Sequence, residues 1–466
     1  MGRHGARADR ADGARRRPRG PPLRLHGHLA PQVHRAPPRA DDGRLRPVGG
    51  VAPTVARTAG GGSTATGGAF ASFRAPGFLR VWLGAVLYAF GIWIERLAIG
   101  WFVLDTTGSV LLAALSLGIR SIPNLVLGPI GGAVSDRVPR GRVLAVTSIV
   151  RAVAAALMSL VVIVDVATVP LLLALVFVTS STLAFHNTSL QPLQAEIAGP
   201  TRLGNAISLT SFGQRSVGAA GALGAGALIG GLGPEPTFFV AALSLACAAV
   251  VFAGLRRPAR TSTGRPPLFR EVLDSLRLLV RIPAVRLLLG MMIVVEILGF
   301  SFASMLPAVA ERVLEVGPEQ LGVLTAGVAV GAMFGTALLV FTTDRLPHGL
   351  MLVGVFVTFG LLVVVLGNST VFWLSVAAAA GIGAAAAMVD ALQWIMLQVS
   401  VGAELRGRAL GGWNFAIGWG WLGPLTLGAV AEATGVPRAL TVSGALLVLF
   451  TLALFASSAT LRQWRR

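Results

Sequence analysis

The stretch DRVPRGRVL occupies residues 136–144, and a variant of it, DRLPHGLML, occupies residues 344–352. Each copy lies in a short polar gap between two long apolar segments. A second pair keeps the same offset, since Ala195-Glu196 recurs as Ala403-Glu404. Many secondary transporters consist of two similar membrane halves with the substrate site between them, near the bilayer midplane. The repeat therefore predicts a membrane protein built from two related halves.

The composition agrees with this class. Apolar residues make up 54% of the 466 residues and charged residues only 13%, too little charge to cover a soluble surface. With about 20 residues per span, the hydropathy pattern predicts an all-α fold of twelve spans. They lie near residues 78–105, 109–134, 143–166, 170–190, 206–231, 237–255, 285–309, 319–341, 349–367, 370–393, 409–431 and 437–459.

Two further segments complete the domain plan of two six-span halves, 71–255 and 285–466. Residues 256–284 form a linker in which 268–281 has the pattern of an amphipathic helix at the membrane surface. Residues 1–70 are rich in Arg, Pro and Gly and are predicted to be disordered. A lipid-binding or nucleic-acid-binding arm and a targeting segment are alternatives. We interpret this tail as inert, the product of a start codon placed too far upstream, and expect no nucleic-acid partner.

The distribution of arginine predicts the orientation. Seventeen Arg lie in the even-numbered gaps and the C-terminal tail, whereas the odd-numbered gaps hold Arg312, with Arg438 at a span end. Positive loops face the cytoplasm. Both termini are therefore expected on the cytoplasmic side of the inner membrane.

The residue types that are missing exclude several activities. All 39 basic residues are Arg, so neither a GxxxxGK[ST] phosphate loop nor a lysine Schiff base can form. The single cysteine, Cys247, excludes an internal disulfide and disfavours a metal site, and no cofactor is expected. A membrane enzyme would need clustered His or carboxylate groups, but the chain after residue 70 contains only His186 and His348, which are far apart in sequence.

Several motifs resemble those of a known family. The stretch GAVSDRVPRGR (132–142) resembles the signature loop between spans two and three of the major facilitator superfamily. The chain is similar, over roughly residues 76–460, to the branch that contains the enterobactin exporter and macrolide efflux proteins. The supporting phrases are GIWIERLAIGW (91–101), GPIGG (128–132), QPLQAE (191–196) and RGRAL (406–410). One departure lies in span five, where Ala219 follows Gly218 in place of the proline of the antiporter signature.

This resemblance implies an inner gate. In the family, the aspartate at position 136 meets the N-terminal end of span eleven, where the helix dipole favours a negative charge. The neighbouring arginines would pair with acids of the inner face, with Glu196 a candidate. The residues assigned to this gate are Gly132, Asp136, Arg137, Arg140, Arg142, Glu196, Asp344, Arg345, Glu404 and Arg408.

Three acids within the spans are candidate proton carriers, because an ionisable group in hydrocarbon should face a cavity or a partner. Glu296 is the only acid predicted at the midplane, and a carboxyl group there could exchange a proton. Its alternative role is to pair with a buried arginine. Glu95 is the second candidate, although Arg96 beside it makes a local ion pair plausible. Asp390, near the inner end of span ten, is the third.

The predicted substrate cavity is positive and partly aromatic. Arg120, Arg151 and Arg215 lie near the midplane and, if they face one cavity, would favour anionic or strongly polar solutes. The alternative is that each packs at a helix interface. Among the membrane tryptophans, Trp93, Trp413 and Trp419 are the ones assigned to the cavity.

The sequence therefore predicts a transporter. The leading hypothesis is proton-coupled export of a small amphiphilic molecule (a drug, a macrolide or a siderophore-like compound) by alternating access. The alternative is uptake of a sugar or another metabolite by the same fold. The expected partners are the substrate, protons and the lipid bilayer, and the expected oligomeric state is a monomer.

Overall fold

A computed structural model describes residues 70–123, 127, 134–135, 137–199, 201–255, 277, 281–342, 346–402, 405–458, 461–462 and 464, with backbone only at Val340, Gly407 and Leu410. Five predicted gate residues lie outside this set: Gly132, Asp136, Asp344, Arg345 and Glu404. Residues 1–69 and most of the predicted linker 256–284 also lie outside it. The predictions for these residues stay predictions. The description below concerns the unit Ala65–Arg466.

Every regular element of the described residues is a helix. The first half contains η1 (Ala71–Arg74), α1 (Phe78–Thr107), α2 (Val110–Gly118), η2 (Ile119–Ser121), α4 (Arg140–Ile163), α5 (Val169–Ala198), α6 (Leu203–Leu232) and α7 (Pro234–Ala253). The second half contains α9 (Pro283–Val294), η3 (Val295–Phe300), α10 (Phe302–Arg312), α11 (Pro318–Thr342), α12 (His348–Asn368), α13 (Phe372–Val399), α14 (Arg406–Gly418), η5 (Trp419–Trp421), α15 (Leu422–Thr434) and α16 (Val436–Ser457).

The predicted spans coincide with these helices, and the all-α prediction is confirmed. Nine of the described helices are long and apolar enough to cross a membrane. The other three predicted spans are not among these nine helices, and their sequences and helical geometry show why. Span five, α6, is rich in Gly and Ala, whereas spans two and eleven are interrupted by the short 3₁₀ turns η2 and η5.

Turn residues define the helix ends. Gly108 ends α1 in the left-handed region at φ 64°, and its N–H donates to the Leu104 carbonyl. Gly435 has φ 93° and is followed by α16, which carries a proline in its first turn. Proline is tolerated there because the first helical N–H groups have no partner within the helix. Adjacent spans can therefore reverse direction within one or two residues.

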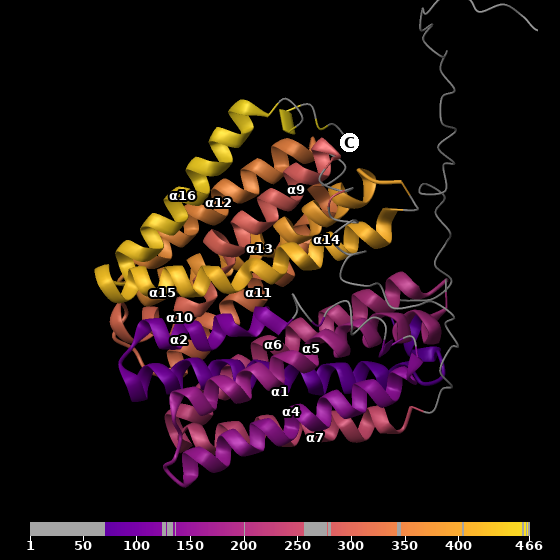
Figure 1. Ribbon diagram of the computed structural model, residues 1–466, viewed down its shortest axis with the longest axis vertical. Coiled ribbons are helices and arrows are strands. Elements are labelled where there is room, and N and C mark those ends of the chain that lie inside the picture. The colour runs from indigo at the N-terminus through magenta and orange to yellow at the C-terminus, as the bar shows by residue number, and fades with distance from the viewer. Residues whose placement is uncertain are drawn as a thin grey trace, which may run out of the picture. The chain divides into compact units, whose positions relative to one another are not determined.

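Small residues allow close packing within and between the halves. Within the second half, a Cβ on Gly331 or Gly335 of α11 would collide with the backbone of Ala380 or Ala384 in α13. Between the halves, α6 packs on α11, and α2 packs on α15 and α10 (Figure 1). Glycine and alanine at such positions bring helix backbones together, which stabilises helix pairs in a membrane.

Three spans change their helical geometry at one place in the molecule. Span two has the 3₁₀ turn η2, span eleven has η5, and span seven has the π-helical turn η3. The segment η5 contacts both η2 and η3. Irregular backbone at membrane depth is tolerated where it lines a cavity or is buried in protein, and π turns are frequent at functional sites. The convergence brings irregular backbone from three spans of both halves together.

Candidate functional site

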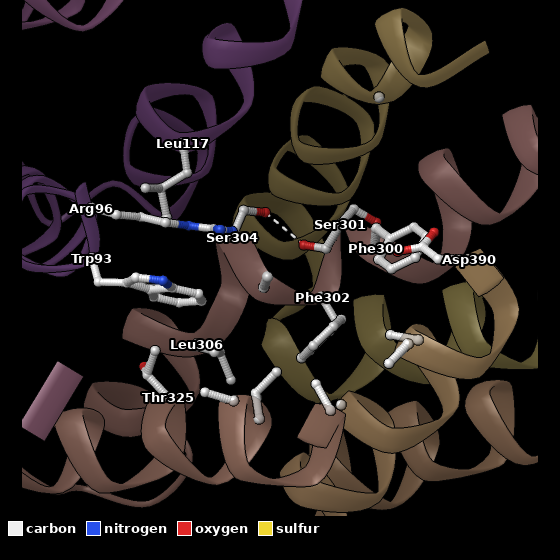
Figure 2. Close-up of a pocket in the computed structure, with 18 of the residues that line it drawn as sticks. Trp93, Arg96, Leu117, Phe300, Ser301, Phe302, Ser304, Leu306, Thr325 and Asp390 are labelled. Atoms are coloured by element: carbon white, nitrogen blue, oxygen red, sulfur yellow. Dashed lines mark hydrogen bonds between the residues drawn. The ribbon is translucent and has the colours of Figure 1, made fainter. Parts of the chain in front are cut away.

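A cavity of about 950 Å³ lies between the two halves. Figure 2 shows side chains of α1 on one side of it and side chains of α10 and α13 opposite. Lining residues also come from α2, α6, α11, α14 and the three irregular turns. A volume of this size suits a drug-sized molecule.

Aromatic side chains supply much of the apolar wall. Trp93, Phe300, Phe302, Trp394 and Trp413 line the cavity. Trp394 and Trp413 meet edge to face with ring centroids 5.6 Å apart. The structure thus places two of the three predicted tryptophans, Trp93 and Trp413, at the cavity.

The third predicted tryptophan, Trp419, is not among the lining residues. Its ring contacts Phe415 edge to face, with centroids 6.1 Å apart. Its buried Nε1 has no hydrogen-bond partner among the described residues.

The charges in the cavity differ from the prediction. Two cations, Arg96 and Arg215, and two acids, Glu296 and Asp390, line it. Arg96 lies over the Trp93 ring, 5.7 Å from its centroid, and both side chains reach into the cavity (Figure 2). The formal charges of the lining therefore balance. The prediction of three arginines in the cavity would have made the lining positive.

Arg120 and Arg151, predicted to line the cavity, lie instead around Glu95. Arg151 Nε is 2.9 Å from Glu95 Oε2, and its Nη2 is 3.1 Å from Oε1. Arg120 Nη2 lies 3.5 Å from the same Oε1. The predicted local pairing of Glu95 with Arg96 is replaced by these contacts, because Arg96 faces the cavity.

The helical period of α1 explains this division. Ala89, Ile92, Trp93, Arg96 and Leu97 line the cavity at spacings of three and four residues, so they share one helix face. Glu95 lies off that face and has no exposed surface. It also accepts a hydrogen bond from Thr179 Oγ1 at 3.2 Å. The three contacts join α1, η2, α4 and α5 inside the first half.

Glu296 lies where the irregular turns converge. It belongs to the π turn η3 and lines the cavity. A Cβ on Gly420 of η5 would lie 2.7 Å from Glu296 Oε2 and 3.5 Å from Ser121 Oγ of η2. The carboxylate therefore rests directly against the backbone of η5. Among the described residues, Glu296 makes no hydrogen bond or ion pair.

The backbone that carries Glu296 has its own partners. Ser443 of α16 donates from Oγ to the Leu298 carbonyl at 2.7 Å, and Ser301 donates to the Ile297 carbonyl at 2.6 Å. Gly423 of α15 lies so close that a Cβ there would be 2.7 Å from the Ile297 carbonyl oxygen. A π turn frees carbonyl groups from the regular helical ladder, and these contacts satisfy two of them.

Asp390 lies deeper than its sequence position indicated. We predicted the end of span ten at residue 393, but α13 continues to Val399. The six additional residues move Asp390 by about 9 Å along the helix, away from its end. It therefore lines the same cavity as Glu296.

Of the described members of the predicted inner gate, Arg137, Arg140, Arg142 and Glu196 lie near the start of α4 and the end of α5, and Arg408 lies in the first turn of α14. Arg140 Nη1 forms an ion pair with Glu196 Oε1. Arg137, Arg142 and Arg408 are exposed. The gating role of these residues stays a prediction.

Comparison with known proteins agrees with the fold. The family of transmembrane secretion effectors matches residues 67–465. No curated protein matches the sequence. The solved structure of the nucleoside transporter NupG has a TM-score of 0.69 at 12% identity and covers 84% of this chain and 100% of that chain. A mutant of the peptide transporter POT in complex with alafosfalin has a TM-score of 0.68 at 14% identity, covering 84% and 96%. At these identities the likeness concerns the fold alone.

Proposed function

Because the chain belongs to the transmembrane secretion effector family, within the major facilitator superfamily, we propose that it exports a small amphiphilic molecule in exchange for protons. The chain is a multi-pass membrane protein and a secondary transporter, and not an enzyme. The direction of transport, the substrate class and the coupling ion are the proposed part.

The observation that carries the proposal is the composition of the cavity between the halves. Alternating access moves two halves around a site at their interface. Here that site combines five aromatic rings with two carboxyl groups, Glu296 and Asp390. The rings suit an apolar body, whereas the acids and the cations Arg96 and Arg215 suit polar or charged groups on the same molecule. An amphiphile of drug size fits this lining better than a uniformly polar sugar.

The accessibility of the acids supports Glu296 and Asp390 as proton carriers. Both line the cavity, where a proton and a substrate can compete for the same space. Glu95, the third candidate, is fully buried and engaged by Arg151 and Arg120. An acid with two cationic partners and no exposed surface is better suited to a structural role. We therefore retain Glu296 as the first candidate and Asp390 as the second.

Two further elements of the proposal follow from charges near the membrane surface. The excess of arginine in the even-numbered gaps supports a cytoplasmic location for both termini in the inner membrane. The ion pair between Arg140 and Glu196 lies on that same side and supports an inner gate there. A monomer remains the proposed oligomeric state.

The test is the accumulation of fluorescent amphiphiles by cells that express the full chain. Wild type is compared with Glu296→Gln, Asp390→Asn and the control Asp105→Asn, with and without a protonophore. Asp105 is an exposed acid near the end of α1 that does not line the cavity. The expected result is exclusion of dye by wild type and Asp105→Asn, abolished by the protonophore and by Glu296→Gln at equal expression.

Other outcomes would redirect the proposal. Exclusion that survives Glu296→Gln but not Asp390→Asn assigns coupling to Asp390. Protonophore-sensitive accumulation of a sugar or another metabolite, with no exclusion of any dye in the panel, would instead establish the uptake alternative. Dye exclusion that is unaffected by the protonophore would refute proton coupling.

A further inference from the structure

The hydrogen bonds between described residues of the two halves lie at one end of the helices. Among the described residues, three such bonds exist, and all involve Gly108, Val110 or Leu111. We call this the Gly108 end, and the opposite end, where α4 begins, the Arg140 end. The bonds join the connection between α1 and α2 to residues of α10 and α15.

Glu432 of α15 caps the N-terminus of α2. Its Oε2 accepts a hydrogen bond from the Val110 N–H at 2.7 Å and from the Leu111 N–H at 3.2 Å. The next N–H, that of Leu112, donates to Ser109 Oγ at 3.2 Å. The first helical N–H groups have no partner within their helix, and the helix dipole favours a negative charge at this position. The second half thus supplies the anion that the first turn of α2 requires.

Arg312 of α10 makes the opposite contact two residues earlier. It donates a hydrogen bond to the Gly108 carbonyl, at the C-terminal end of α1. A cation is favourable at a helix C-terminus for the same reason that an anion is favourable at an N-terminus. The short connection between α1 and α2 is therefore held by two charges of the second half, each matched to the helix end that it meets.

The internal repeat relates the interface of α2 with α15 to the interface of α6 with α11. In the described part of the chain, capping by a charged side chain is present at the first of these interfaces and not at the second. With the offset of the repeated loop, 136 to 344, the partner of Val110 is Pro318 and the partner of Glu432 is Gly224. Pro318 has no N–H to donate, and Gly224 has no carboxylate. At that interface α6 and α11 meet through their backbones, since a Cβ on Gly226 would lie 2.5 Å from the Pro318 carbonyl oxygen and 3.0 Å from Gly322 Cα. Both interfaces pack closely, but polar capping by a charged side chain occurs only at the interface of α2 with α15 among the described residues.

Along α2 and α15, the capped interface lies between the cavity and the Gly108 end. The lining residues of α2 begin at Leu117, and the only lining residue of α15 is Pro424. Beyond them, toward the Gly108 end, the two helices pack tightly: a Cβ on Gly428 would lie 2.9 Å from Ala114 Cβ. If α2 separates from α15 at this end, the hydrogen bonds to Glu432 must break.

We propose that Glu432 is a gate residue: its carboxylate, assisted by Arg312, holds the cavity closed at the Gly108 end and releases α2 when the cavity opens there. The contact uses charge and backbone dipoles exposed to water, so each bond is weak enough to break in every cycle. The inference goes beyond the proposed function, because it holds for either direction of transport and for any coupling ion.

The experiment measures the separation of the halves directly. The full chain carries Cys247→Ser and nitroxide labels at Asp105→Cys and Arg438→Cys, one exposed position in each half near the Gly108 end. Double electron–electron resonance in lipid nanodiscs gives the distance distribution between the labels. The variants are Glu432→Gln and Val110→Pro. The second removes one donor and leaves Glu432 intact, and it suits the fold because proline is tolerated at the first helical position and Ser109 is already extended, with φ −99° and ψ 117°.

A matched control is Glu235→Gln. Like Glu432, Glu235 is an acid at the N-terminus of a helix at the Gly108 end, but it lies in the first turn of α7, within the first half. We expect Glu432→Gln to raise the ratio of the long-distance to the short-distance population about two- to fivefold, and Val110→Pro to raise it less. Glu235→Gln should leave it at the wild-type value. The proposal is overturned if neither gate variant changes the ratio, or if Glu235→Gln changes it as much as Glu432→Gln does.

Discussion

Glu95 of α1 and Arg151 of α4 form a bidentate ion pair in the interior of the first half, with N···O distances of 2.9 Å and 3.1 Å. Neither side chain reaches the cavity, and both are almost completely buried. Arg151 also donates to the Thr179 carbonyl of α5 at 3.0 Å. The pair therefore ties three spans of one half together, so that this half can move as a unit.

The first prediction concerns the stability of this half. Glu95→Gln leaves the Arg151 guanidinium buried without its carboxylate, and breaking a buried pair costs about 3–5 kcal/mol. Chemical denaturation in detergent should show a lower free energy of unfolding by an amount of this order. The double variant Glu95→Leu with Arg151→Met replaces both charges by apolar groups and should recover much of the loss. If Glu95→Gln instead keeps its stability and loses proton coupling, Glu95 is a carrier and not a structural residue.

The second prediction tests the contact between Glu296 and Gly420. In Gly420→Ala the new Cβ would lie 2.7 Å from Glu296 Oε2, so the carboxylate must move away from η5. We expect dye efflux to fall about tenfold while the protein remains folded, because a displacement near 1 Å can cost that much in a positioned site. Gly411→Ala, on the neighbouring α14, is the control, since nothing lies within 4 Å of a Cβ there. Equal effects of the two substitutions would argue against a role for the Glu296 position.

The third prediction tests the π turn itself. Ser443→Ala removes the donor to the Leu298 carbonyl and should lower the free energy of unfolding by about 1 kcal/mol. Since η3 also carries Glu296, the pH profile of dye efflux should shift or broaden, whereas a purely structural role would leave the profile unchanged. Ser457→Ala, on the same helix, is the matched control, because its hydroxyl donates to the Ala453 carbonyl of its own helix.

The sequence was sufficient to predict the spans, but it did not show which face of each helix lines the cavity. Hydropathy finds a buried segment because every residue type contributes to it, and each of the twelve predicted spans coincides with helix over its described residues. Depth along a helix follows from its rise, and on that basis Arg120, Arg151 and Arg215 were predicted to lie near the midplane. Which side each faces depends on packing with other spans. Arg96, which lines the cavity, was therefore missed as a cavity residue, and Arg151 was placed there although it binds Glu95.

The irregular turns η2, η3 and η5, which interrupt three spans, were not predicted from the sequence for a related reason. A π turn or a short 3₁₀ turn depends on contacts from neighbouring helices, such as Ser443 and Gly423 around η3. No proline lies within the three turns, but Pro123 follows η2 by two residues and Pro424 follows η5 by three, and each lacks the N–H that a carbonyl of the turn would otherwise bind. These prolines and the density of Trp between Trp413 and Trp421 were the available signals, and the tryptophans were interpreted only as candidate cavity residues.

The last prediction concerns the Arg140 end. Arg140 begins α4, where a cation is unfavourable, and its ion pair with Glu196 of α5 offsets that charge. Glu196→Arg should place two cations side by side and lower the free energy of unfolding by about 1 kcal/mol. The charge-swapped double variant, Arg140→Glu with Glu196→Arg, should restore stability, because it also places an acid at the start of α4. Dye efflux then separates two roles for the pair. If the contact gates transport, the single variant loses efflux and the swap restores it, whereas stability that recovers without efflux would limit the pair to holding α4 and α5 together.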